Sequence, residues 1–126
     1  MTPSPIRIRR GVRARRDGRR GEILCALWLM AKGYRIVGFR MRTAQAEIDL
    51  LATKGGVVAV VEVKRRTSLG AALDAVTPRQ RDRLLGAARS IAARRPEFAT
   101  AAIRLDLMAL APGRWPRHIR DAWREG

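Results

Sequence analysis

The sequence predicts a mixed α/β domain in which a central β-sheet is flanked by helices. Three observations lead to this fold class. An apolar helical segment comes first, three strand-like segments follow it, and a second helical segment precedes one or two further strands. At 126 residues the chain has the size of one ordinary domain, which can bury a core without disulfides.

The first part of the chain predicts a flexible arm followed by a helix. Residues 1–17 are rich in Arg and Pro with little apolar periodicity, so we expect a basic arm ahead of a folded domain at 18–126. Residues 19–32 read RRGEILCALWLMAK and are apolar on nearly all sides. This is the pattern of a helix packed between a sheet and other elements, and Gly33 is placed to end it.

Three strands are predicted next, at 34–41, 46–53 and 57–64. The last two are separated by Gly55-Gly56, a dipeptide that favours a two-residue hairpin turn. Residues paired across such a turn have numbers that sum to 111.

A second helix and a return to the sheet follow. Thr77, Pro78 and Gln80 provide an N-cap, a proline at the first helical position and the third residue of a capping box, and the helical pattern stops before Pro96. Residues 101–110 then read as a strand, and a last short strand is predicted around His118.

The hairpin register brings two carboxylates together. Asp49 falls opposite Glu62 and Glu47 opposite Lys64, and period-two alternation places all four on one face. Apolar residues make up the rest of that face and the whole opposite face, so we expect both to be covered. Opposed like charges destabilise a sheet, and the pair therefore needs a physical reason.

Two half-buried carboxylates can share a proton, or they can share a hard divalent cation such as magnesium. Lys64 lies about 6.6 Å beyond Glu62 on the same face, and Glu22 is the one acid of the predicted first helix. A cation, an ammonium and carboxylates suit phosphodiester hydrolysis. The alternative is an ordinary Glu47–Lys64 ion pair beside an exposed Asp49–Glu62 pair at the end of a sheet.

The charge balance indicates an anionic partner. The formal net charge is +16, and the first twenty residues, with eight Arg and one Asp, carry only part of it. Nucleic acid is the leading candidate, with a merely solvated basic surface as the alternative. Arg outnumbers Lys 24 to 3, so a lysine at position 64 is an exception that a compact ammonium would explain.

Other function classes receive less support. No segment approaches the ~20 apolar residues that span a bilayer, so we expect no membrane association. A single cysteine and no apolar leader favour the cytoplasm. Cys25 reads as a core residue, His118 alone cannot form a zinc site, and for Trp115 and Trp123 core packing is preferred over stacking on nucleic-acid bases.

The spacing of the acidic residues resembles a known nuclease motif. Asp49, twelve residues, then Glu62-Val63-Lys64 is similar to the active-site pattern of the PD-(D/E)XK nuclease superfamily. Gly21-Glu22 and the segments AEIDLLA, VEVKRR, AVTPRQ, RLDL and HIRDAW resemble the YraN family within it, over residues 18–123. The resemblance implies a restriction-endonuclease-like αβββαβ core, close to archaeal Holliday-junction resolvases, which act on branched DNA and often form homodimers.

The same resemblance assigns roles by position. Asp49 and Glu62 would bind Mg²⁺ or Mn²⁺ with the Val63 carbonyl as a possible third ligand, Lys64 would be the catalytic lysine, and Glu22 the acid on the helix. The sequence departs from the pattern at Ala46, where glycine is expected, and at Arg40, where many members carry Asn.

Further residues are candidates for contact with nucleic acid. They are Arg65, Arg66, Gln80, Arg81 and Arg83. The arginines are expected to contact phosphates without reading bases, as is the predicted basic arm. For Gln80 a capping role is at least as strong an interpretation as a place beside the substrate.

Together these observations predict a metal-dependent endonuclease that acts on DNA, with selectivity for branched or single-stranded structure. The first alternative is a nucleic-acid-binding module that has the nuclease fold without the chemistry. The second is a protein-interaction adaptor, whose binding would lack the steep salt dependence of phosphate contacts.

Overall fold

The computed structural model describes residues 19–124, so the predicted arm at 1–17 lies outside the described residues. The first described element is a helix at residues 19–31. The elements after it are β1 (Arg35–Arg42), β2 (Glu47–Lys54), β3 (Val57–Arg65), α2 (Leu69–Asp74), α3 (Pro78–Ala93), the 3-10 helix η1 (Pro96–Phe98), β4 (Ala102–Leu110) and β5 (Arg117–Ile119).

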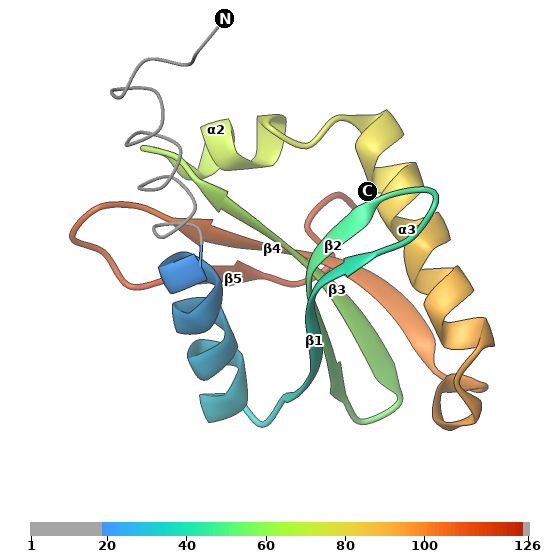
Figure 1. Ribbon diagram of the computed structural model, residues 1–126. Coiled ribbons are helices and arrows are strands. Elements are labelled where there is room, and N and C mark those ends of the chain that lie inside the picture. Colours follow the sequence, from blue (N-terminus) through green and yellow to red (C-terminus); the bar gives the residue numbers. More distant parts are fainter. Residues whose placement is uncertain (1–18, 125–126) are drawn as a thin grey trace, which may run out of the picture.

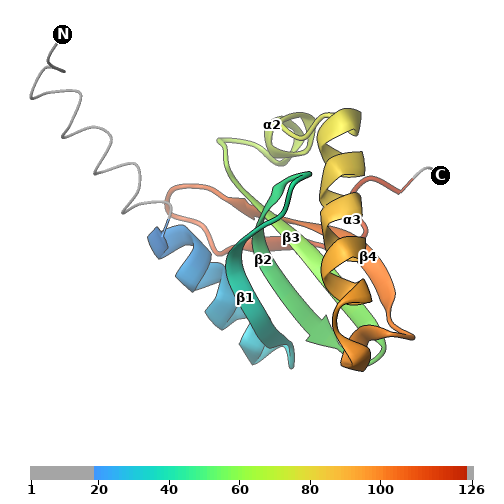
Figure 2. The same ribbon diagram turned by 45° about the vertical axis from the view of Figure 1, so that its right-hand side comes forward.

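The strands form one five-stranded mixed sheet in the order β1-β2-β3-β4-β5. Successive neighbours are antiparallel except β3 and β4, which are parallel because the chain crosses between them through α2 and α3. Helix 19–31 and α3 lie on opposite sides of the sheet (Figures 1 and 2). The predicted fold class, a mixed α/β sheet flanked by helices with an αβββαβ core, is confirmed.

The core lies on both sides of the sheet. Cys25 and Leu29 of helix 19–31 pack with Leu50 on one side, and Leu84 of α3 packs with Leu51 on the other. Both covering layers are apolar, as the near-continuous aliphatic runs of β2 and β3 require.

Local sequence signals explain where α3 begins. The Thr77 side chain accepts a hydrogen bond from the backbone N–H of Gln80, and the Gln80 side chain accepts one from the backbone N–H of Thr77. This capping box was predicted and is confirmed. The short α2 was not predicted, although Ser68 caps it in the same way by accepting from the Ala71 N–H.

Helix 19–31 differs from the prediction in one respect. Its sheet-facing side is buried, but Ile23, Leu27 and Met30 are more than half exposed. The expectation that other elements would cover this side is wrong for the described chain. Residues 22–31 also carry no Lys or Arg in a chain that has 27 of them. The result is an exposed apolar stripe, defined by Ile23, Leu27 and Met30.

Within residues 19–124, none of the helices combines the length and the apolar character that crossing a bilayer requires.

Candidate active site

The diglycine turn sets β2 and β3 in the predicted register. Residues 50–54 pair with residues 57–61 in numbers that sum to 111, and Gly55 has a φ of 58°, which glycine adopts without strain. The register is confirmed over this span. The paired ladder then ends, and the next residue on each strand is Asp49 or Glu62.

The predicted alternation of faces is wrong where the ladder ends. Ile48 and Leu51 are three positions apart, yet both belong to the core cluster that packs against α3. Asp49 lies at this irregularity, near enough to helix 19–31 for its charge to act on the thiol of Cys25. Glu47 pairs with Arg42 of β1 at 3.1 Å, so the alternative of a Glu47–Lys64 ion pair is also wrong.

The two carboxyl groups nevertheless meet. The backbone N–H of Val63 donates a hydrogen bond of 2.9 Å to Oδ2 of Asp49, which fixes the side chain against β3. The carboxyls of Asp49 and Glu62 are close enough for each to shift the pKa of the other. Two acids this close oppose each other's ionisation, so one of them retains a proton more readily than an isolated carboxyl group.

The electrostatics of the pair follow from its burial. Burial and the charge of Asp49 raise the pKa of Glu62 to about 7, against the attraction of Lys64. Burial and the charge of Glu22 raise the pKa of Asp49, against the Val63 hydrogen bond and Lys64. Ionisation of both carboxyl groups is therefore unfavourable in this partly buried site.

One ammonium accompanies the pair. Nζ of Lys64 lies 3.4 Å from Oε1 of Glu62, and both side chains are largely buried. A single positive charge compensates only one of the two carboxylates, and the site retains capacity for a further cation.

Glu22 is the third carboxylate of the group, and it comes from helix 19–31. Both of its oxygens accept from Nε of Arg40, at 2.9 and 3.1 Å. Arg40 has a φ of 48°, in the left-handed region, which Asn tolerates better than most residues. Arg40 thus replaces the Asn of the resembled pattern at a backbone position that suits Asn. Its side chain is paired with Glu22.

Gly21 determines how closely helix 19–31 approaches the sheet. A Cβ at this position would lie 2.9 Å from Cδ1 of Leu110 in β4, closer than carbon atoms normally approach. The absence of a side chain therefore lets the start of the helix rest on the end of β4, and Glu22 follows directly.

The residues present fit a magnesium-like ion. Within residues 19–124 no three side chains of His, Cys, Asp or Glu are grouped as a complete metal cage. Mg²⁺ often takes only one or two carboxylates and keeps several waters. Asp49 and Glu62 supply two carboxylates that repel each other when both are charged, which is the donor set such an ion requires.

The residues predicted to contact nucleic acid are found in two places. Arg65 and Arg66 follow Lys64 at the end of β3 and are exposed. Gln80 is engaged in the capping box of α3. Arg81 donates to the Val76 carbonyl and stacks on the ring of Trp123, and these contacts hold it against its own domain. Arg83 is exposed on α3.

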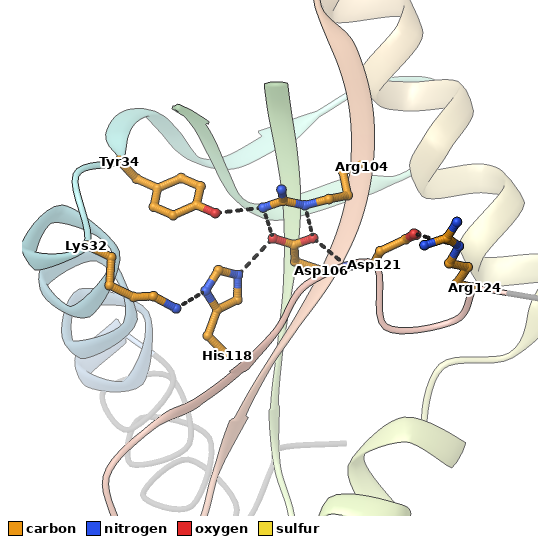
Figure 3. Close-up of polar contacts among 7 residues, drawn as sticks. All are labelled: Lys32, Tyr34, Arg104, Asp106, His118, Asp121 and Arg124. Carbon is orange, nitrogen blue, oxygen red and sulfur yellow. Dashed lines mark hydrogen bonds and ion pairs between the residues drawn. The ribbon is translucent and has the colours of Figure 1, made fainter. Parts of the chain in front are cut away.

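A second polar cluster was missed by the sequence analysis. Asp106 of β4 is fully buried and accepts from Nε and Nη2 of Arg104 at 2.7 and 2.8 Å, and it contacts Nε2 of His118 at 2.8 Å. His118 in turn lies 2.7 Å from Nζ of Lys32, and Arg104 donates to the hydroxyl of Tyr34 (Figure 3). The available signal was an aspartate inside an apolar strand, the same signal that drew attention to Glu62.

This cluster clamps three parts of the fold together. It joins β4 and β5 to the segment that follows helix 19–31, and none of its buried side-chain polar atoms lacks a hydrogen-bond partner. Burial alone would raise the pKa of Asp106, but hydrogen bonds from His118, Arg104 and the Asp121 amide outweigh it and lower the pKa to about 2. The aspartate is therefore charged, and its role is structural.

The cysteine and the tryptophans can now be placed. Cys25 is buried, and burial together with the charge of Asp49 raises its pKa to about 12, so the prediction of an inert core thiol holds. Trp123 packs against the core and donates to the Leu73 carbonyl, as predicted. For Trp115 the prediction of core packing is wrong, because 75% of its surface is exposed.

Comparison with known proteins identifies relatives across most of the chain. The profile described as "Uncharacterised protein family UPF0102" matches residues 21–110. A UPF0102 protein of Caulobacter vibrioides (strain NA1000 / CB15N) is 59% identical over 118 residues, which is 94% of both chains. Another, from Caulobacter sp. (strain K31), is 64% identical over 90% of this chain and 82% of its own. One from Parvibaculum lavamentivorans is 47% identical over 90% of this chain and 86% of its own.

Proposed function

The chain belongs to the UPF0102 family, and we propose that it is a metal-dependent endonuclease of the PD-(D/E)XK type that hydrolyses phosphodiester bonds in DNA in the cytoplasm. The proposal rests on one observation. Asp49 and Glu62 lie together, partly buried, and the ammonium of Lys64 lies beside them. This combination costs stability unless a cation joins it, and a pair of partly buried acids with raised pKa values supports a functional role.

Each residue of the site would have its own role. Asp49 and Glu62 would hold a Mg²⁺ or Mn²⁺ ion, with the Val63 carbonyl as a further ligand. When bound, such an ion polarises a phosphoryl oxygen and lowers the pKa of an attacking water. Nζ of Lys64, kept in place by Glu62, orients that water or stabilises charge that develops on the phosphate.

Glu22 has a positioning role in this scheme. It forms an ion pair with Arg40, and its negative charge still raises the pKa of Asp49. Glu22 would therefore tune the pair without binding the ion itself.

The charge of the protein supports a polyanionic substrate. Arg65 and Arg66 continue directly from the catalytic end of β3, where they can contact phosphates on either side of the bond that is cut. Such contacts carry no sequence information, which favours selection of the substrate by its structure.

A homodimer is part of the proposal. The apolar stripe of Ile23, Leu27 and Met30 lies on the helix that also carries Glu22. A second copy of a chain with a net charge of +16 can approach closely only where cations are absent, and residues 22–31 provide such a surface. Two copies joined at this stripe would hold their two carboxylate sites at a fixed distance and orientation.

The test is cleavage by purified protein. In Mg²⁺ or Mn²⁺ the protein should cut branched or single-stranded DNA, and Asp49→Asn and Glu62→Gln should reduce cutting by at least about 100-fold while they retain DNA binding. Binding without cutting would favour the non-catalytic module, and binding that does not respond to salt would favour the adaptor. Equal cutting by wild type and variants would show contamination and end the proposal.

A further inference from the structure

Trp115 is the most exposed large hydrophobic residue that the structure describes. It lies in the loop between β4 and β5, and its ring stacks on Trp28 of helix 19–31 with centroids 5.6 Å apart and an angle of 26° between the planes. One side of the indole is thus supported by a fixed ring, while 75% of the residue remains in solvent. A rigid, supported and open aromatic face is a surface on which another planar group can stack.

The surroundings of Trp115 are basic. It lines a shallow pocket together with Arg66, Arg114 and Arg117, and the hydroxyl residues Thr67 and Ser68 lie there too. The pocket lining contains no Asp or Glu. Among residues 19–124, neither Arg114 nor Arg117 is paired with a carboxylate. An aromatic face bordered by unpaired guanidinium groups has the chemistry for a ligand that is both planar and anionic.

The pocket is connected to the carboxylate site by the sheet itself. Lys64 of β3 is the partner of Ala109 in β4, and Ala109 is the partner of Arg117 in β5. These three residues form one row across three strands, so the Cα atoms of Lys64 and Arg117 are about 10 Å apart at two strand spacings. Residues aligned in a row project from the same face, and Ala109 places this row on the face that packs against α2. Trp115, two residues before Arg117, lies at the edge of the sheet, where it stacks on Trp28 of helix 19–31.

We propose that Trp115 stacks on an unpaired nucleobase of single-stranded DNA, with the neighbouring phosphates on Arg66, Arg114 and Arg117. The proposal rests on the nuclease function proposed above and specifies what its substrate must contain. A base on Trp115 would belong to a strand whose phosphates contact Arg66, Arg114 and Arg117, and Arg117 is aligned with Lys64 across the sheet. In a duplex the base faces are covered by neighbouring pairs, so stacking on a protein ring requires a base that is already free.

This arrangement would make the selection structural. Phosphate contacts by the arginines act on duplex and single strand alike, whereas the stacking contact is available only where a strand is unpaired, as at a gap, a flap or a branch. The preference for such DNA would then reside mainly in one side chain outside the carboxylate site.

The experiment measures binding without cutting. Full-length protein carrying Glu62→Gln, in EDTA, is titrated with a labelled single strand, with the matching duplex and with an abasic strand of the same length. Trp115→Ala should weaken binding of the normal single strand by about 5- to 100-fold, leave duplex binding unchanged, and have no effect on the abasic strand. Trp115→Phe should retain much of the affinity.

Matched controls separate stacking from charge. Arg117→Ala should weaken the binding of both single strand and duplex and lower the salt dependence of binding. The control is Arg89, an exposed arginine on α3 away from the pocket, and Arg89→Ala should cause neither change. Equal effects of Trp115→Ala on single strand and duplex, no effect on either, or tighter binding of RNA than of DNA would each overturn the assignment.

The two proposals fail separately. If the wild-type protein cuts DNA but Trp115→Ala binds and cuts single strands normally, the stacking site is wrong and the nuclease stands. If nothing is cut and Trp115→Ala still loses single-strand affinity, the nuclease is wrong and the stacking site stands.

Discussion

The backbone N–H of Val63 donates to the carboxylate of Asp49, and this bond holds the acid of one strand beside the acid of the next. The hydrogen bond favours a charged Asp49, while burial and the nearby Glu22 disfavour it. Binding of a cation would favour the charged form of both carboxyl groups.

Metal affinity should therefore depend on pH. Because the pKa of Glu62 is raised to about 7, the ion must displace a proton below that pH. We expect the Mn²⁺ affinity measured by calorimetry to rise about tenfold per pH unit below 7 and to level off above it. Glu62→Gln should bind weakly with little dependence on pH, and a flat profile for the wild type would contradict this account.

The metal-free protein should be destabilised by its own site. Glu62 has a folded-state pKa above its unfolded value of 4.5, so its contribution favours the folded state at low pH and is lost as the pH rises through about 7. Glu62→Gln should raise the free energy of unfolding at pH 8 by about 1–2 kcal/mol and by less at pH 5. Denaturant melts in EDTA measure this, and a Glu62→Gln protein less stable than wild type at pH 8 would refute it.

The position of Lys64 predicts that an arginine cannot replace it. The larger, forked guanidinium should bind both carboxylates and take the place of the ion. We expect Lys64→Arg to lower the cleavage rate by at least about 100-fold with the fold intact. The matched control is Lys54→Arg, at the hairpin turn, which should cut DNA at the wild-type rate.

The Asp106 cluster should be a main source of stability. Asp106→Asn leaves Arg104 partly buried without its charged partner, so we expect a loss of about 3–5 kcal/mol in urea unfolding. Asp121→Asn, an exposed side chain nearby, should change stability by less than about 0.5 kcal/mol.

The same cluster sets a limit in acid. The pKa of Asp106 is lowered to about 2 from an ordinary 3.8, so its contribution is complete above 3.8 and is lost as the pH falls through 2. An acid titration followed by circular dichroism should show this loss in the wild type and not in Asp106→Asn.

The apolar stripe predicts a dimer that one charge can dissociate. Leu27→Glu places a charge where a second copy would pack, and light scattering should then report the monomer mass. Ala99→Glu makes the same change on an exposed residue of the chain after η1 and should leave the dimer intact. A wild-type protein that is monomeric at all concentrations would contradict the prediction.

The sequence predicted best those features that depend on neighbouring residues. The turn at Gly55 fixes the register of its neighbours, and Thr77 with Gln80 starts α3, so both were predictable. The irregularity at Asp49 was not, because it depends on how β1, with Arg40 in a left-handed conformation, meets β2.

Other features escaped because they depend on long-range partners. The members of the Asp106 cluster are far apart in the sequence, from Lys32 to Asp121, and no sequence spacing predicts that they meet. Core packing was expected for both Trp115 and Trp123, but Trp115 lies in the loop between β4 and β5 and is 75% exposed, whereas Trp123 packs against the core.

The absence of a side chain at Gly21 positions a carboxylate of the candidate site through the backbone alone. Because Leu110 sits where a side chain would be, the height of the helix above the sheet is set by contact between a hydrogen atom and a leucine. The distance of Glu22 from the sheet is therefore set by a neighbouring residue that has no side chain. A side chain introduced there would have to displace Leu110 or the helix, and a shift of the helix would move Glu22 without changing any charge.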